Sequence, residues 1–171
     1  GYAADEVKRI LLEEGVRSAI IDLGGNVYAL GKKNNGQLWR IGIQDPFDST
    51  GNYLGISNVE DKSIVTSGDY ERYYLYKGHK YHHILDPNTG YPSESGLRSV
   101  SIISDKSIEG DALSTALFIL GVEKGTEVIS KLEGIEAIFI TKEGEVIVGE
   151  KLMDNFSLKG DKLKLVKNPY S

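Results

Sequence analysis

The pattern of apolar and polar positions opens the chain with a helical period. Across residues 3–14, Val7, Ile10 and Leu11 fall on one side, while most charged residues fall elsewhere. This spacing predicts an amphipathic helix. Gly15 ends it, because glycine readily adopts the conformation found at helix C-termini.

Most of the later pattern is typical of short strands, because β-branched, aromatic and other apolar residues gather between turn-forming residues. The predicted strands cover residues 18–23, 27–30, 38–43, 63–67, 70–76, 100–103, 135–141 and 145–148, with shorter ones around 56 and 163–166. Residues 24–26 interrupt the first strand, which resumes at 27. Asn35-Gly36 predicts a hairpin turn before the strand at 38–43. Lys77-Gly78-His79 predicts a second turn.

Two further helices are expected in the second half of the chain. Residues 111–120 are almost wholly apolar and are followed by Gly121, which predicts a helix buried on most sides. Residues 123–132 predict another helix, and the prolines within 81–92 predict an ordered loop. Since repeats and linkers are absent from the sequence, we expect one α+β unit over residues 1–171, with a mainly antiparallel sheet and about three helices.

The net charge and the absence of cysteine exclude several kinds of binding partner and of active-site chemistry. The chain of 171 residues has a formal net charge of −5, with 40% hydrophobic and 26% charged residues. An acidic chain without a basic stripe is a poor partner for nucleic acid or an anionic membrane. No apolar run is long enough to cross a bilayer, so we expect no membrane insertion by this chain. The absence of cysteine excludes disulfides, thiolate zinc sites and cysteine nucleophiles.

Asp111 and Thr115 are the first candidate site. Residues four apart share one face of a helix, so their oxygens can reach the same point, and hard oxygen ligands suit Mg²⁺. From the spacing alone, a purely structural interpretation is the stronger one. Asp is favoured near a helix start, and a helical Thr often bonds back to the preceding turn.

The second candidate is the loop that begins at His82 and His83. A histidine followed by Asp86 can form a general base with an orienting carboxylate, although Asp86 can also simply stabilise its own turn. Because successive strand residues point to opposite faces, only one of the two histidines should face a site. Thr66-Ser67-Gly68, at a strand end, can approach a phosphate or a flavin edge, or can be an ordinary strand exit.

Six segments follow one another along the chain: Gly1-Tyr-Ala-Ala-Asp5, Ile21-Asp-Leu-Gly-Gly-Asn26, Trp39-Arg-Ile-Gly-Ile43 with Pro46, Val65-Thr-Ser-Gly-Asp-Tyr70, His83-Ile-Leu-Asp-Pro-Asn-Thr-Gly-Tyr-Pro92 and Asp111-Ala-Leu-Ser-Thr115. Together they resemble the FAD:protein FMN transferase (ApbE) family, with its T-fold-related domain. The last two are the most specific. Beyond Thr115, only the order of helix, strand and hairpin agrees.

The resemblance implies Mg²⁺-dependent transfer of FMN from FAD to a Thr or Ser hydroxyl of a target protein, with release of AMP. Asp111 and Thr115 would then bind Mg²⁺, and His83 would act on the diphosphate or the acceptor hydroxyl. The flavin pocket would include Leu85 and Asp86 of the histidine loop, and residues 66–68 would lie close by.

The resemblance also implies what this chain lacks. Family members carry a metal ligand, a lysine and an acidic FAD contact before the segment that matches Gly1–Asp5. We therefore expect this chain to be a C-terminal portion with little or no activity alone. An FAD pyrophosphatase and a non-catalytic flavin-binding module remain alternatives. The implied acceptor is a redox-complex subunit, such as one of a sodium-pumping NADH:quinone reductase. The implied location is the extracytoplasmic side of a bacterial membrane, as a lipoprotein.

Overall fold

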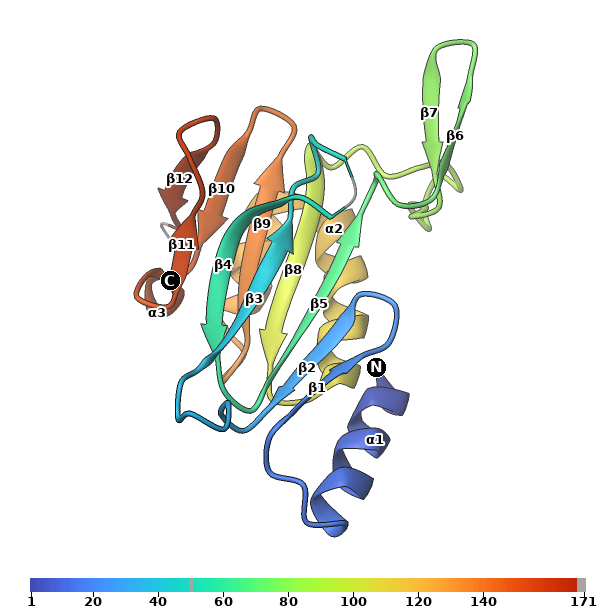
Figure 1. Ribbon diagram of the computed structural model, residues 1–171. Helices are drawn as coiled ribbons and strands as arrows, with labels where there is room; N and C mark the ends of the chain where they lie inside the picture. Colours follow the sequence, from blue (N-terminus) through green and yellow to red (C-terminus); the bar gives the residue numbers. More distant parts are fainter. Residues whose placement is uncertain (50, 169–171) are drawn as a thin grey trace.

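A seven-stranded sheet forms the centre of the protein, in the order β1-β2-β5-β8-β9-β10-β12 (Figure 1). The computed structural model describes residues 1–49 and 51–168. All neighbouring strands are antiparallel except β10 and β12, which run parallel. The bounds are β1 Ala19–Asp22, β2 Asn26–Leu30, β5 Lys62–Gly68, β8 Leu97–Ser104, β9 Glu136–Thr141, β10 Glu145–Val148 and β12 Lys164–Lys167. The expected α+β class and mainly antiparallel pairing are confirmed.

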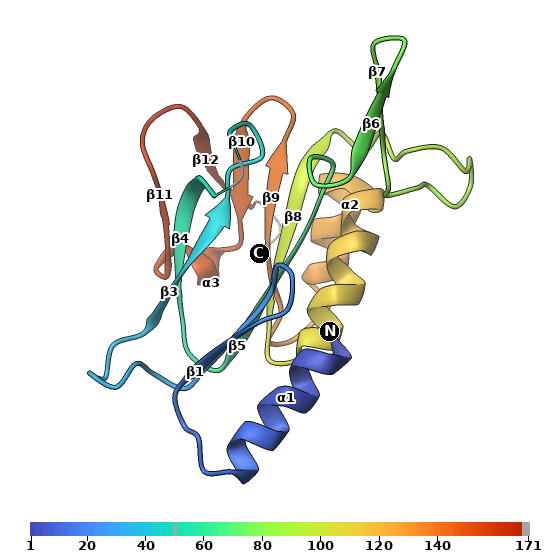
Figure 2. The ribbon, with the colours of Figure 1, turned by 45° about the vertical axis from the view of Figure 1, so that its right-hand side comes forward.

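Two different layers cover the faces of this sheet. A three-stranded sheet, ordered β11-β4-β3, packs on one face, and the long helix α2 packs on the other (Figure 2). Alternate residues of β9 serve the two layers: Ile138 and Ile140 join the core between the sheets, whereas Ala137 and Phe139 join the core under α2. The bounds are β3 Trp39–Gln44, β4 Tyr53–Val59, β11 Phe156–Leu158, α1 Tyr2–Glu13, α2 Ser107–Ile129 and α3 Glu150–Met153.

The structure corrects two expectations about strand pairing in the first half of the chain. The turn at residues 33–36 forms, with the Gly36 amide donating to the Lys33 carbonyl at 2.8 Å, but the strands on either side enter different sheets. Strands β1 and β2 are not one interrupted strand. They form a hairpin, because Gly24 and Gly25 both adopt positive φ.

A third correction concerns α2. The two predicted helices, 111–120 and 123–132, are joined across a kink at Gly121, whose φ of 81° is not helical. The helix also starts earlier than predicted, at Ser107. It is not buried on most sides, since its outward face is exposed, and this face includes Asp111, Ala112, Thr115, Ala116 and Leu120. The one described helix that the sequence pattern missed is the short α3.

A separate two-stranded hairpin, β6 Tyr73–Tyr76 and β7 His79–His82, projects from one end of the main sheet (Figures 1 and 2). Its first strand starts at Tyr73 and not at residue 70 as predicted. The predicted turn is present, because Lys77 and Gly78 both adopt positive φ. In the described part of the chain, no helix is long and apolar enough to cross a membrane.

The start of α2 is held by a carboxylate from α1. Asp5 accepts hydrogen bonds from the backbone amides of Ser107, at 2.8 Å, and Ile108, at 2.9 Å. The first amides of a helix have no partner within the helix, and the positive end of the helix dipole favours an anion there. Asp5 therefore caps α2 from a distance of more than one hundred residues in sequence.

We expect Asp5→Ala to lower the free energy of unfolding by about 1–2 kcal/mol, because two helix-end amides lose their acceptor. Urea denaturation measures the change. Glu6→Ala is the matched control, since Glu6 pairs only with exposed Arg9 on the same helix in the described contacts. Equal losses in the two variants would contradict the capping role.

Candidate functional site

Asp111 and Thr115 lie on the exposed face of α2, beside the end of β5. The Thr115 hydroxyl is 3.0 Å from the Ser67 hydroxyl, and Ser67 is also 2.9 Å from the Ser114 hydroxyl. The Asp111 side chain is 57% exposed, and its Oδ2 lies 2.6 Å from the nitrogen of Gly1. The Asp111 carboxylate and the Thr115 hydroxyl thus lie on the same exposed face of α2, one helical turn apart, with the Ser67 hydroxyl beside Thr115.

The three residues of the predicted phosphate or flavin contact divide between the two faces of β5. Thr66 faces away from α2 and lies 2.7 Å from the hydroxyl of Ser101 on β8, whereas Ser67 faces α2. Gly68 has no room for a side chain, because a Cβ there would lie 2.4 Å from the Tyr70 ring. Of the three, Ser67 is the one whose side chain reaches Thr115.

The two histidines of the predicted base loop have different environments, as the strand alternation predicts. His82 is buried, with Nε2 3.2 Å from the Ser93 carbonyl and its ring edge-on to Phe118. Burial lowers the pKa of His82, and the hydrogen bond to Ser93 partly opposes this shift. His83 is exposed, which leaves it as the histidine available to a ligand.

The backbone carbonyl of Arg72 fixes the orientation of His83. This oxygen accepts from the His83 amide at 3.1 Å and lies 3.2 Å from Nδ1 of the ring. A carbonyl only accepts, so Nδ1 must carry the proton in this contact. In the neutral ring, Nε2 is then the unprotonated nitrogen and can receive a proton.

Asp86 has the structural role that its turn sequence suggested. Its Oδ1 accepts from the Asn88 amide at 2.8 Å, and its backbone carbonyl accepts from the Gly90 amide at 2.8 Å. Leu85, next to it, pairs with Pro92 and is 50% exposed. Hydrogen bonds within the loop hold its conformation. The exposed side chain of Leu85 remains accessible to a ligand.

The histidine loop meets α2 one turn beyond the Asp111–Thr115 pair. His82 contacts Phe118, which follows Thr115 by three residues on the same helix. The loop therefore contacts α2 on the helical turn after the one that carries Thr115. No described contact joins His83 directly to Asp111 or Thr115.

A buried ion-pair cluster at the same end was not recognised from the sequence. The Asp69 side chain is 5% exposed and lies 2.8 Å from Nη1 of Arg98 and 3.2 Å from Nζ of Lys80. Burial lowers the pKa of Lys80, and the charge of Asp69 opposes this shift. The cluster fixes β7 against the main sheet. In the sequence, Asp69 stands out only as an acid that follows Ser67-Gly68. Its partners Lys80 and Arg98 lie 11 and 29 residues further along the chain, so the sequence does not indicate the ion pairs.

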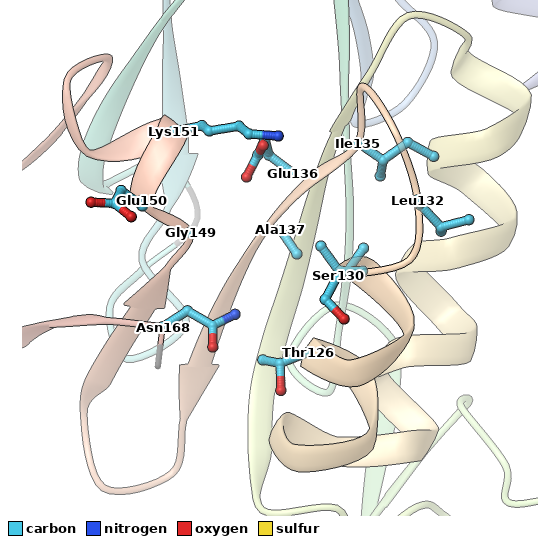
Figure 3. A pocket seen from close by; sticks show the side chains of 11 residues that line it. Thr126, Ser130, Leu132, Ile135, Glu136, Ala137, Gly149, Glu150, Lys151 and Asn168 are labelled. Carbon is cyan, nitrogen blue, oxygen red and sulfur yellow. The ribbon is translucent and has the colours of Figure 1, made fainter. Parts of the chain in front are cut away.

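Two hollows lie near these elements. A pocket of about 310 Å³ sits between the end of α2 and α3, with the side chains of Glu136 and Lys151 pointing toward one another at its edge (Figure 3). None of the predicted site residues lines it. A groove of about 600 Å³ runs between β7 and the histidine loop, and Asp86 is one of its lining residues.

Comparison with known proteins agrees with this architecture. The profile described as "ApbE family" matches residues 1–139. A FAD:protein FMN transferase of Klebsiella pneumoniae is 43% identical over 157 residues, which are 92% of this chain and 48% of that protein. One of Treponema pallidum is 38% identical over 162 residues, with 90% and 45% covered.

Solved structures give the same result for the fold. The crystal structure of the ApbE protein from Thermotoga maritima has a TM-score of 0.82 and 33% identity, and covers 91% of this chain and 50% of that chain. The flavin transferase ApbE from Vibrio cholerae has a TM-score of 0.69 and 27% identity. The chain thus spans about half the length of the relatives it matches. By its matched residues and its fold, this chain belongs to the ApbE family.

Proposed function

We propose that this chain is part of a Mg²⁺-dependent enzyme that transfers FMN from FAD to a Thr or Ser hydroxyl of an acceptor protein and releases AMP. The observation that carries the proposal is that Asp111 and Thr115 share the exposed face of α2, with Ser67 beside Thr115. The loop that carries His83 is anchored to the same helix where His82 packs on Phe118. The relatives named as FAD:protein FMN transferases support the same chemistry.

The donor set fits magnesium. Mg²⁺ prefers hard oxygen ligands and is usually held by one or two carboxylates together with waters and substrate phosphates. Asp111 offers an exposed carboxylate and Thr115 a hydroxyl on the same helix face. The described residues contain no group of three or more His, Cys, Asp or Glu side chains placed to hold a metal. When bound, the ion would neutralise charge on the diphosphate oxygens.

His83 supplies the base. The acceptor hydroxyl attacks the phosphorus of the FMN half of FAD, and a new oxygen–phosphorus bond forms. The bond from that phosphorus to the bridging oxygen breaks, and AMP leaves with the bridging oxygen. The hydroxyl proton passes to Nε2 of His83, whose Nδ1 is already engaged with the Arg72 carbonyl.

An FAD pyrophosphatase is the second candidate, and the exposure of His83 favours it, because water reaches the same nitrogen. Mass spectrometry separates the two reactions, since only the transferase adds the mass of FMN to a protein. A non-catalytic flavin-binding module would bind FAD without regard to Mg²⁺ or Asp111. The proposed acceptor is a subunit of a redox complex, and the proposed location is the extracytoplasmic side of a bacterial membrane.

We expect Asp111→Ala and Thr115→Val, in the full-length protein, to weaken Mg²⁺ binding by on the order of tenfold or more, because each removes an oxygen ligand. Calorimetric titration measures the affinity, and circular dichroism should show an unchanged fold. Asp161→Ala, in an exposed loop, is the control. Unfolding of Thr115→Val would instead favour the structural interpretation of this residue.

For His83→Ala we expect unchanged FAD binding and a loss of FMN transfer by about 10²–10⁴-fold, which is typical for removal of a general base. Fluorescence titration gives the FAD affinity, and the mass of the acceptor protein gives the transfer rate. Asn88→Ala, an exposed residue of the same loop, should retain transfer. Normal turnover by His83→Ala would remove this residue from the mechanism.

Residues 1–171 alone should transfer little or no FMN, because the chain spans about half the length of its relatives and its described residues contain no group of three or more His, Cys, Asp or Glu side chains that could hold a metal. The assay combines this chain with FAD, Mg²⁺ and an acceptor protein. Transfer at the rate of a relative of full length would contradict this expectation.

A further inference from the structure

The projecting β6–β7 hairpin has two different faces. The strand register pairs Tyr74 with Tyr81 and Tyr76 with His79, so these four side chains share one face. We refer to Tyr74, Tyr76, His79 and Tyr81 as the aromatic face. The opposite face carries exposed Tyr73 and Leu75 together with Lys80 and His82. Lys80 and His82 hold the hairpin to the body through Asp69 and the Ser93 carbonyl.

The aromatic face is open to solvent. Tyr74 is 64% exposed and Tyr76 is 57% exposed, while the Tyr74 and Tyr81 rings stack on each other at 5.1 Å. In the described residues, β6 and β7 pair only with each other. A two-stranded hairpin is marginally stable by itself, and clustered exposed aromatics mark interaction surfaces. The hairpin therefore has the properties of a surface that a partner covers.

Charge indicates the chemistry of this partner. Residues 72–82 contain no carboxylate, although the whole chain has a formal net charge of −5. Exposed Arg72 and Lys77 are the cations available to a partner, since Lys80 pairs with buried Asp69 on the opposite face. Lys77 also lies over the Tyr76 ring, 5.4 Å from its centroid. Complementary charge steers association and selects among partners. A basic, aromatic surface on an acidic protein favours an acidic polypeptide.

The position of the hairpin connects it to the proposed reaction. His83 follows β7 directly, and the Arg72 carbonyl at the base of β6 accepts from both the His83 amide and its ring. The groove of about 600 Å³ between β7 and the histidine loop, lined by Tyr81 and Asp86, leads from the hairpin along this loop. A polypeptide on the aromatic face is thus held next to the proposed base.

We propose that the aromatic face docks the acceptor protein, through an acidic segment that flanks the hydroxyl to be modified. This inference rests on the proposed function, because it assigns the protein-recognition surface of the same site. The hairpin binds the acceptor and takes no part in binding FAD.

The test uses the full-length protein with the double variant Tyr74→Ser/Tyr76→Ser and the charge variant Lys77→Glu. We expect the KM for the acceptor protein to rise roughly tenfold in each, as when a binding hot spot is removed. The kcat and the affinity for FAD should stay unchanged. Tyr53→Ser, at the start of β4, and Lys162→Glu, between β11 and β12, change exposed residues outside the hairpin and are the matched controls, which should leave the KM unchanged.

An unchanged acceptor KM in both variants would overturn the inference, as would an equal loss of FAD affinity, which would place the hairpin in the flavin site. Loss of binding to phosphatidylglycerol vesicles, or loss of a dimer in gel filtration, with a normal acceptor KM would assign the face to a membrane or to a second copy. If the protein without substitutions transfers no FMN to the acceptor, the proposed function fails, and the docking inference fails with it.

Discussion

The candidate site depends on one contact, in which the Asp5 carboxylate accepts hydrogen bonds from the first backbone amides of α2. Two amides of the helix that lack helical partners donate to this side chain, so α1 is fixed where α2 begins. The same turn is tied to the sheet, because the Ser107 hydroxyl bonds Asn26 and lies 2.7 Å from that of Ser63. The register of α2 along the sheet follows from these bonds at its first turn.

With its start fixed, α2 presents two different faces. Leu117 and Phe118 enter the core over the sheet, while Asp111 and Thr115 face outward. A rigid helix places side chains more reproducibly than a loop does, which suits the proposed site. The exposed apolar residues beside Asp111 explain why the sequence alone suggested deeper burial for this helix.

The second fixed point is the buried carboxylate of Asp69. Its ion pairs to Lys80 and Arg98 join the hairpin to β8, and a buried pair of this kind constrains geometry more than it adds stability. Since His83 bonds the base of the hairpin, its orientation depends on this cluster as well. The helix face and the base loop are thus held by separate polar contacts, which meet where His82 packs on Phe118.

The sequence by itself determined the strand periods, the Lys77-Gly78 turn, the different exposure of His82 and His83 and the shared face of Asp111 and Thr115, because each depends on local geometry. It did not determine that the strands beside the 33–36 turn enter different sheets, since a turn fixes chain reversal and not strand partners. The tertiary structure alone decided that Asp5 caps α2, that Ser67 reaches Thr115 and that Asp69 pairs with Arg98. These contacts join residues far apart in sequence, and only the packing of the layers brings them together.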